Sequence, residues 1–424
     1  MAHSVRFAAL LAVAVPIAPV AAADGPAAVL GNYADIAQAM YGDALVRAEK
    51  LDQAVGALLQ SPDEATLAAA REAWLAAREP YQQTEVYRFG NPLVDEWEGK
   101  VNAWPLDEGL IDYVLVESYG DSSDENAFYV ANVVANPKLT VGGKEIDAST
   151  IGPDLLAELH EIDEVEANVS RGYHAIEFLI WGQDLNGTGP GKGARPATDY
   201  AKGDACTGGN CDRRGAYLAA ATKLLVSDLQ EMVGNWAANG PARAALTAEG
   251  GQKGLAMMLT GLGSLSYGEL AGERIKLGLM LHDPEEEHDC FSDNTHNSHY
   301  YDVLGMRAVY LGRYEGIDGK ITEGASLSNL VRAADPAVDE AMRVALDKTL
   351  AAFTAIKESA DSGQMAYDQM LAEGNEPGNA MIQAAVDALV AQTRTIEQAV
   401  GALRLDQLAF EGSDSLDNPE AVFQ

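Results

Sequence analysis

Apolar residues recur along most of the chain at steps of three and four, the spacing of one face of an α-helix. Within residues 155–180 they fall at Leu155, Leu159, Ile162, Val165, Val169, Tyr173, Ile176 and Ile180. The same pattern runs through 33–59, 64–90, 216–237, 338–357 and 379–404. These spacings predict long amphipathic helices, including one continuous helix over 155–180.

Three stretches interrupt the helical pattern. Gly142-Gly143 between two short alternating runs predicts a small β-hairpin inside the polar segment 117–150. Residues 182–213 are Gly-rich and aperiodic, which predicts a long loop, and 249–268 is a third Gly-rich break near a boundary between halves. We therefore predict an all-α protein of two helical bundles packed side by side, related by a possible duplication, with one hairpin insertion. The expected divisions are a signal peptide at 1–23, an N-terminal bundle at 24–245, a C-terminal bundle at 246–410 and a polar tail at 411–424.

The first 23 residues have the features of a secretory signal: Arg6, an apolar run and a small-residue cleavage site at Ala21–Ala23. The run is short and broken by prolines, and no later run of about 18 apolar residues follows. We expect an exported, periplasmic protein, soluble or peripheral to the envelope, with no integral membrane segment in the mature chain.

The formal net charge of −35 disfavours nucleic acid and anionic lipid as partners and attracts cations, although an acidic surface also simply maintains solubility. Cys206 and Cys211 flank a short Gly-rich loop. In an oxidising compartment a disulfide is favoured there over a metal knuckle, because no second ligand pair lies nearby in the sequence. Cys290 is then expected to be a buried free thiol.

The strongest candidate for chemistry is His174 with Glu177, three residues apart on one helix face in "RGYHAIEFLIWGQD". Trp181 continues that face. An imidazole and a carboxylate suit a first-row transition metal, but the same pair also occurs as a polar contact between helices. A metal would need further ligands from elsewhere in the fold.

Three other polar groups are candidates for a functional site. His160 lies among acids and is interpreted as part of a solvated face. Arg78, Tyr81, Glu85 and Arg88 form a row that is either an exposed salt-bridged face or the wall of a pocket. Four histidines crowd into 282–299; helix capping explains the acids there but not His288, Asp293, Asn294 or His296.

Four segments in order resemble the imelysin-like family. "GYHAIEFLIWGQD" is similar to its G-x-H-x-x-E motif, "EEEHDCFSDNTH" to its second hallmark, "AWLAAREPYQQTEVYRFG" to its N-terminal helix and "NAWPLDEGLIDYV", which holds Trp104, to the following segment. The resemblance spans about residues 30–410 and looks closest to the iron-regulated protein A branch; insulin-cleaving membrane proteases are also similar. The motif falls on Gly172, His174 and Glu177. Asp289 stands where a small polar residue is expected.

The resemblance implies two helical halves with a site where they meet, export, and a link to iron supply. It also implies a proposed zinc metallopeptidase activity. We expect a metal site at His174 and Glu177, with a further ligand from Glu85, Glu273, Glu287 or His288. Iron is the favoured ion and zinc the alternative. The expected function is binding a metal ion, or a metal-bearing small ligand, as a component of iron transport; a metallopeptidase and a non-catalytic scaffold remain alternatives.

Overall fold

A computed structural model describes residues 25–423 of the protein. The segment expected to be a signal peptide lies outside the described residues. The longer helices are α1 (Pro26–Gln60), α2 (Glu64–Gln82), α3 (Pro92–Asn102), α7 (Gly172–Trp181), α8 (Cys211–Trp236), α10 (Gly251–Ser264), α12 (Thr295–Leu311), α14 (Pro336–Asp361) and α16 (Glu376–Ala402). Shorter helices are α4 (Glu108–Ile111), α5 (Val116–Tyr119), α6 (Pro153–Leu159), α9 (Pro241–Ala248), α11 (Leu277–Leu281), α13 (Leu327–Ala334), α15 (Tyr367–Leu371) and α17 (Asp414–Asp417).

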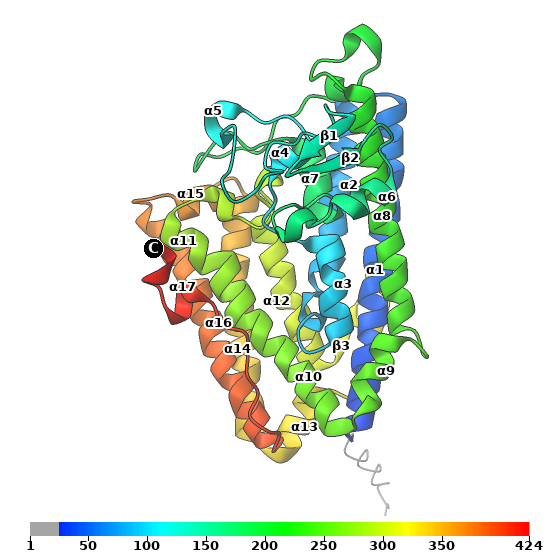
Figure 1. The fold of residues 1–424 in the computed structure, drawn as a ribbon. Helices are drawn as coiled ribbons and strands as arrows, with labels where there is room; N and C mark the ends of the chain where they lie inside the picture. Colours follow the sequence, from blue (N-terminus) through cyan, green and yellow to red (C-terminus); the bar gives the residue numbers. More distant parts are fainter. Residues whose placement is uncertain (1–24, 424) are drawn as a thin grey trace, which may run out of the picture.

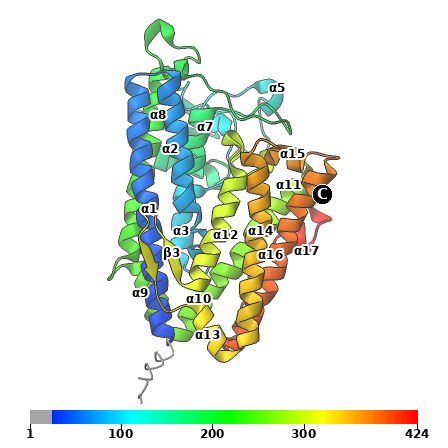
Figure 2. The same cartoon turned by 180° about the vertical axis from the view of Figure 1, so that it is seen from behind.

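The helices form two bundles that lie side by side (Figures 1 and 2). In the first, α1 packs against α2 and α8, while α7 packs against α2, α3 and α8. In the second, α14 packs against α16 and α12. Helix α12 also contacts α2, so it joins the bundles where their cores meet. The all-α prediction is confirmed; the exact division at residue 246 stays a prediction.

Local signals account for the starts of several helices. Asp63 caps α2 in a reciprocal capping box with Thr66. Asp335 caps α14 and Asn375 caps α16, and a proline follows each cap in the first turn. Helix α2 ends at Gln82, earlier than the expected 90, and continues as a single 3₁₀ turn at Glu85–Tyr87.

The continuous helix expected over 155–180 is wrong. The chain leaves α6 at Leu159, and Glu161, Asp163 and Glu164 then adopt left-handed backbone angles. A new helix starts only at Gly172. The apolar spacing continues across the break because α6 and α7 both face the same core. Periodicity alone therefore could not reveal that the helix is interrupted.

The Gly-rich break expected at 249–268 is also wrong, because α10 runs through it and continues as a π-helical segment over Leu265–Lys276. Its glycines serve close packing. A Cβ on Gly261 would lie 2.2 Å from the Val86 carbonyl oxygen, and one on Gly263 would lie 2.4 Å from the ring of Phe410. The chain after residue 410 returns along this segment, where the Ser415 hydroxyl donates to the carbonyl of Gly272.

The predicted hairpin is present as β1 (Lys138–Val141) paired with β2 (Lys144–Asp147). The expectation of a single hairpin is wrong, because β3 (Arg313–Glu315) pairs with β4 (Ile321–Glu323) to form a second one. Residues 182–210 are mostly loop with two 3₁₀ turns, Ala197–Tyr200 and Gly203–Ala205. The predicted Cys206–Cys211 disulfide is formed. Within residues 25–423 no helix is long and apolar enough to cross a membrane.

Candidate metal centre between the bundles

Helix α7 lies wholly inside the protein, and all ten of its residues are buried. Its first residue, Gly172, has φ +86°, and a Cβ there would lie 2.5 Å from the carbonyl oxygen of Val101 in α3. Only glycine fits this close approach without strain. The motif glycine therefore sets α7 against α3 and fixes the position of His174 two residues later.

The second motif folds into a tight polar turn that faces α7. The Asp289 N–H donates to the Thr295 hydroxyl at 3.0 Å, and the Asn294 side chain donates to Asp289 Oδ2 at 2.9 Å. Ser298 donates to the same carboxylate oxygen. These contacts fix the Asp289 carboxylate, and with it the neighbouring His288, against the first bundle.

Three potential ligands meet at this junction. One ligand atom from each of His174, His288 and Asp289 lies within 4.8 Å of the other two. His174 Nδ1 is 3.9 Å and His288 Nδ1 is 3.7 Å from Asp289 Oδ1. Glu177 approaches the same nitrogen of His174, with Oε2 3.2 Å from His174 Nδ1, and its Oε1 accepts from the Ser292 N–H at 2.9 Å.

Arg78 of α2 clamps the carboxylate of this group. Its guanidinium reaches Asp289 Oδ1 at 2.7 Å and Oδ2 at 3.3 Å, and a third N–H donates to Asn102 at 2.6 Å. Both side chains are at most 1% exposed. The buried pair links the two bundles directly, and it also places a permanent positive charge beside the candidate centre.

The electrostatic environment keeps both imidazoles neutral. Burial, followed by the Arg78 charge, lowers the pKa of His174 to about 3, and burial lowers the pKa of His288 well below its ordinary value. Burial and the Asp289 charge raise the pKa of Glu177 well above its usual range. Burial acts to raise the pKa of Asp289, but Arg78, His174 and hydrogen bonds together hold it below its ordinary value.

These protonation states suit a metal centre. A neutral imidazole has a free nitrogen lone pair, and Asp289 is an ionised oxygen donor. Neither His174 Nε2 nor His288 Nε2 has a hydrogen-bond partner, although both atoms are buried. Buried polar atoms without partners are uncommon, so the residues present fit a bound ion.

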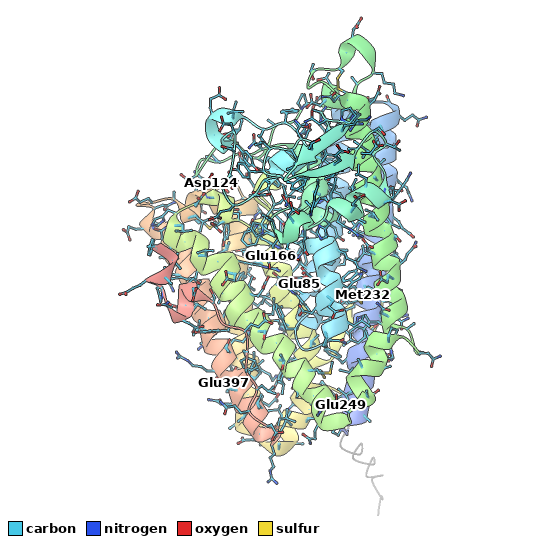
Figure 3. All side chains as sticks on the ribbon, in the orientation of Figure 1. Glu85, Asp124, Glu166, Met232, Glu249 and Glu397 are labelled. Carbon is cyan, nitrogen blue, oxygen red and sulfur yellow. A yellow bond between two sulfur atoms is a disulfide. The ribbon has the colours of Figure 1, made fainter. Side chains whose placement is uncertain are left out.

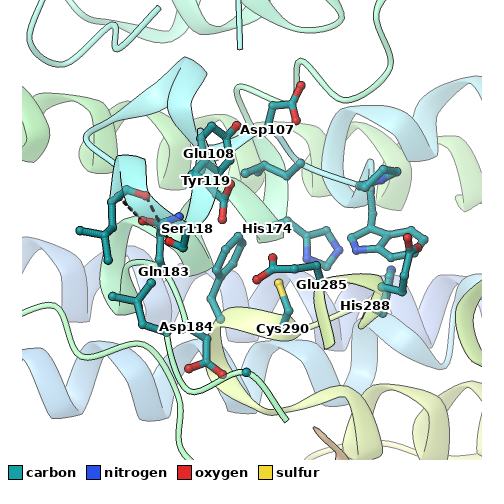
Figure 4. A pocket seen from close by; sticks show the side chains of 18 of the residues that line it. Asp107, Glu108, Ser118, Tyr119, His174, Gln183, Asp184, Glu285, His288 and Cys290 are labelled. Atoms are coloured by element: carbon teal, nitrogen blue, oxygen red, sulfur yellow. Dashed lines mark hydrogen bonds between the residues drawn. The ribbon is translucent and has the colours of Figure 1, made fainter. Parts of the chain in front are cut away.

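A cavity of about 550 Å³ opens onto this group. Both histidines belong to its wall together with acidic residues (Figure 4). The wall also includes Trp104 and Phe291. The acidic lining consists of Asp107, Glu108, Asp184, Glu285 and Glu286. Cys290 is half-buried in the same wall, which corrects the expectation of a buried thiol. The cavity offers a cation a route from solvent to the histidines that is lined by carboxyl groups.

The structure separates the other proposed ligands. His288 joins His174, as described. Glu85 instead accepts from Arg274 at 2.7 Å and lies between the bundles (Figure 3). Glu273 is half-buried near Glu286 and belongs to no ligand group formed by residues 25–423. Glu287 is fully buried but outside the group of His174.

The remaining motif residues support the site. Trp104 donates its indole N–H to the Glu287 carbonyl at 3.1 Å, and its ring meets that of His288 edge-on. Trp181 packs edge-on against Trp74 in the core of the first bundle. His296 is directed away, with Nε2 3.0 Å from Asp361.

Two expectations about polar residues need correction. His160 is not on a solvated face; it is half-buried, its Nε2 lies 2.8 Å from the Gly99 carbonyl, and burial lowers its pKa to about 4. Of the two alternatives for the row from Arg78 to Arg88, the exposed salt-bridged face is wrong, because Arg78 and Tyr81 of α2 and Glu85 of the following 3₁₀ turn are buried. A carboxylate that sequence reasoning missed, Asp289, lies at the centre of the site. Its only signal was that it replaced an expected small polar residue.

The fold and the site together define a two-bundle, all-α protein with a histidine–carboxylate group at the bundle junction. The Imelysin family model (Peptidase_M75) matches residues 37–396, and the chain belongs to that family. It is 41% identical over 64 residues to iron-regulated protein A of Synechococcus elongatus; the match covers 15% of this chain and only 18% of that protein. A crystal structure from Parabacteroides distasonis, of a protein assigned as an iron-regulated protein A precursor, has a TM-score of 0.62 at 17% identity. That alignment covers 91% of this chain and 97% of the other, and it shows a shared fold.

Proposed function

We propose that this imelysin-family protein is exported and binds iron at the bundle junction as a component of iron uptake. The observation that carries the proposal is the convergence of two buried histidines and one buried carboxylate, His174, His288 and Asp289, at an acid-lined cavity. Two imidazoles and one carboxylate with open positions are a donor set typical of non-haem Fe(II). The names of the two relatives support iron over other ions.

Glu177 has a role beside this group. Its carboxyl is fully buried, fixed by the Ser292 N–H, and close to His174 Nδ1. A carboxylate that contacts a ligating histidine orients the ring and increases its basicity. We infer that Glu177 acts on the ion either as a further donor or through His174. Because burial raises the pKa of Glu177, the metal-free protein holds a proton on this carboxyl, and a bound cation would displace that proton.

Calorimetry of the metal-free chain from residue 24, prepared without a chelating tag, tests the proposal. Fe(II), Fe(III) and Zn(II) are titrated into the wild type, His174→Ala and His288→Ala. A matched control is His282→Asn, since His282 lies outside the ligand group and its left-handed backbone suits asparagine. We expect one iron site per chain, weakened at least 100-fold in both alanine variants and unchanged in the control.

Two outcomes would contradict this function. No binding to the wild type, or equal binding to the alanine variants, would make the histidines only a polar contact between bundles. Selective zinc binding would favour the second candidate, a zinc metallopeptidase. The observation in favour of that activity is Glu108, a cavity residue whose pKa burial raises to about 8, within the range of a general acid or base. Peptide hydrolysis lost in Glu108→Gln would support it.

A further inference from the structure

A second group of carboxylates lies on the other side of the motif turn. One oxygen from each of Asp184, Asp293 and Asp368 lies within 4.8 Å of the other two. Asp184 comes from the Gly-rich loop after α7, Asp293 from the turn before α12, and Asp368 from α15. Three segments that are far apart in the sequence therefore present acids to one point.

Glu287 supplies an independent sign of a missing partner at this point. Its side chain is 0% exposed, and neither carboxylate oxygen has a hydrogen-bond partner of good geometry among the described residues, although the Asp368 carboxyl and the Thr295 hydroxyl lie close to it. The groups that act on it most are the Asp368 carboxyl, the Thr295 hydroxyl and the Asp293 carboxyl. Glu287 therefore faces the acidic group, whereas the next two residues of the motif face His174.

The group contains no basic residue that would neutralise it. None of the four carboxylates forms an ion pair with a lysine or arginine within 4.0 Å in the described part of the chain. Lys192, in the Gly-rich loop, acts on Asp293 only from a longer distance. Asp293 Oδ1 and Asp368 Oδ2 are buried and without hydrogen-bond partners, like both oxygens of Glu287. Two of these carboxylates, Glu287 and Asp368, are buried and the other two are half-buried, and converging carboxylates in such surroundings repel one another unless a proton or a cation lies among them.

We propose that Asp184, Asp293, Asp368 and Glu287 form a second cation site that binds Ca²⁺. The donors are all oxygens, which select hard cations rather than the transition metals that histidines attract. Ca²⁺ accepts six to eight oxygens and tolerates several carboxylates in irregular geometry, whereas Mg²⁺ usually takes one or two carboxylates and keeps its waters. The site shares no residue with the group of His174, so it stands independently of the proposed iron binding.

An ion at this point has a structural consequence. Asp184 also belongs to the wall of the cavity that opens onto the histidines. A Ca²⁺ ion would tie the Gly-rich loop to α15 and to the turn before α12, and so fix one side of the cavity mouth. The second motif then serves two sites at once: His288 and Asp289 face one, while Glu287 and Asp293 face the other.

The test uses EDTA-treated full-length chain from residue 24, with CaCl₂ as the probe. Variants are Asp368→Asn and Asp184→Asn; the latter changes a half-buried loop residue and is expected to fold. The matched control is Glu397→Gln, an exposed acid of α16 (Figure 3). Thermal unfolding and tryptic cleavage after Lys192 are followed as Ca²⁺ is added. We expect Ca²⁺ to raise the Tm and slow that cleavage in the wild type and control, with at least a tenfold weaker response in both variants.

Two results would overturn the site. One is a wild type whose Tm and tryptic cleavage do not respond to millimolar Ca²⁺. If Asp368→Asn also raises the Tm in the absence of Ca²⁺, protons shared among the carboxyl groups would explain the group without a cation. The other is an equal Ca²⁺ response in the wild type, Asp184→Asn and Asp368→Asn. His174→Ala separates the two proposals: it should lose iron binding and keep the Ca²⁺ response, and loss of both would contradict an independent site.

Discussion

Replacing Arg78 with methionine tests whether the buried Arg78–Asp289 pair both holds the bundles together and competes with a bound ion. The substitution keeps much of the apolar stem but removes two hydrogen bonds to Asp289 and one to Asn102. It also removes a guanidinium whose carbon lies 5.0 Å from the ring centre of Tyr173. The Asp289 carboxylate would remain buried without its main counter-charge.

The expected cost follows from this burial. Removing one partner of a buried ion pair costs about 3–5 kcal/mol, because the other charge is left uncompensated. An exposed pair contributes less than about 1 kcal/mol. Arg307→Met is the matched control, since Arg307 and Asp347 are 3.2 Å apart with side chains 38% and 64% exposed. The same lost charge should strengthen metal binding by about tenfold, or 1.4 kcal/mol, because a cation would then be the counter-charge of Asp289.

Urea unfolding followed by tryptophan fluorescence measures the stability change, and calorimetry with Zn(II) or Fe(II) measures the affinity. We expect Arg78→Met to lose several times more stability than Arg307→Met and to recover more of it when metal is added. Equal losses in the two variants would refute the buried clamp. If Arg78→Met loses the expected stability but its metal affinity is unchanged or weaker than that of the wild type, Asp289 is not a ligand.

Three further predictions concern the backbone at Gly172, the pH dependence of stability and the cysteines. Gly172→Ala should lower the free energy of unfolding by about 1–3 kcal/mol and weaken metal binding, because φ at this position is +86° and the new Cβ would meet a carbonyl of α3. Gly120→Ala is the control for backbone strain without a clash, because φ there is +98° and no atom lies within 4 Å of the new Cβ. Burial raises the pKa of Glu108 to about 8, so the folded state keeps a proton that the unfolded state releases above about 4.5. Stability should therefore fall as pH rises from 4.5 through 8, by at most about 1.4 kcal/mol per pH unit, and Glu108→Gln should flatten the Tm profile within this same pH range. Thiol titration of the denatured, unreduced chain should find one reactive thiol, because Cys206 and Cys211 are bridged; three would exclude the disulfide.

Helical periodicity and turn chemistry predicted most of the fold, because long amphipathic helices and a Gly-Gly hairpin have strong local signals. Periodicity failed where tertiary packing decides the backbone. The apolar spacing within 155–180 continues through a stretch of residues with left-handed backbone angles, which ends the helix α6. The glycines of α10 resemble a loop in sequence, yet they permit close packing against Val86 and Phe410.

The candidate site was predicted in part. The spacing of His174 and Glu177 indicated a shared face, and the family resemblance directed attention to His288. Nothing local could show that Arg78 and Asp289 form a buried pair, because the two residues belong to different bundles. For the same reason Glu287 was expected as a ligand of the histidine site and Asp293 had no assigned role, although the turn of the motif brings both to a separate group of acids.

X-ray diffraction from crystals of the metal-free protein soaked with Fe(II) under anaerobic conditions, recorded on both sides of the iron absorption edge, tests the central claim most directly. We predict one strong anomalous peak at the bundle junction, within about 2.0–2.3 Å of a nitrogen of His174 and of His288 and an oxygen of Asp289. A peak elsewhere, or none at this junction at saturating iron, would contradict the account.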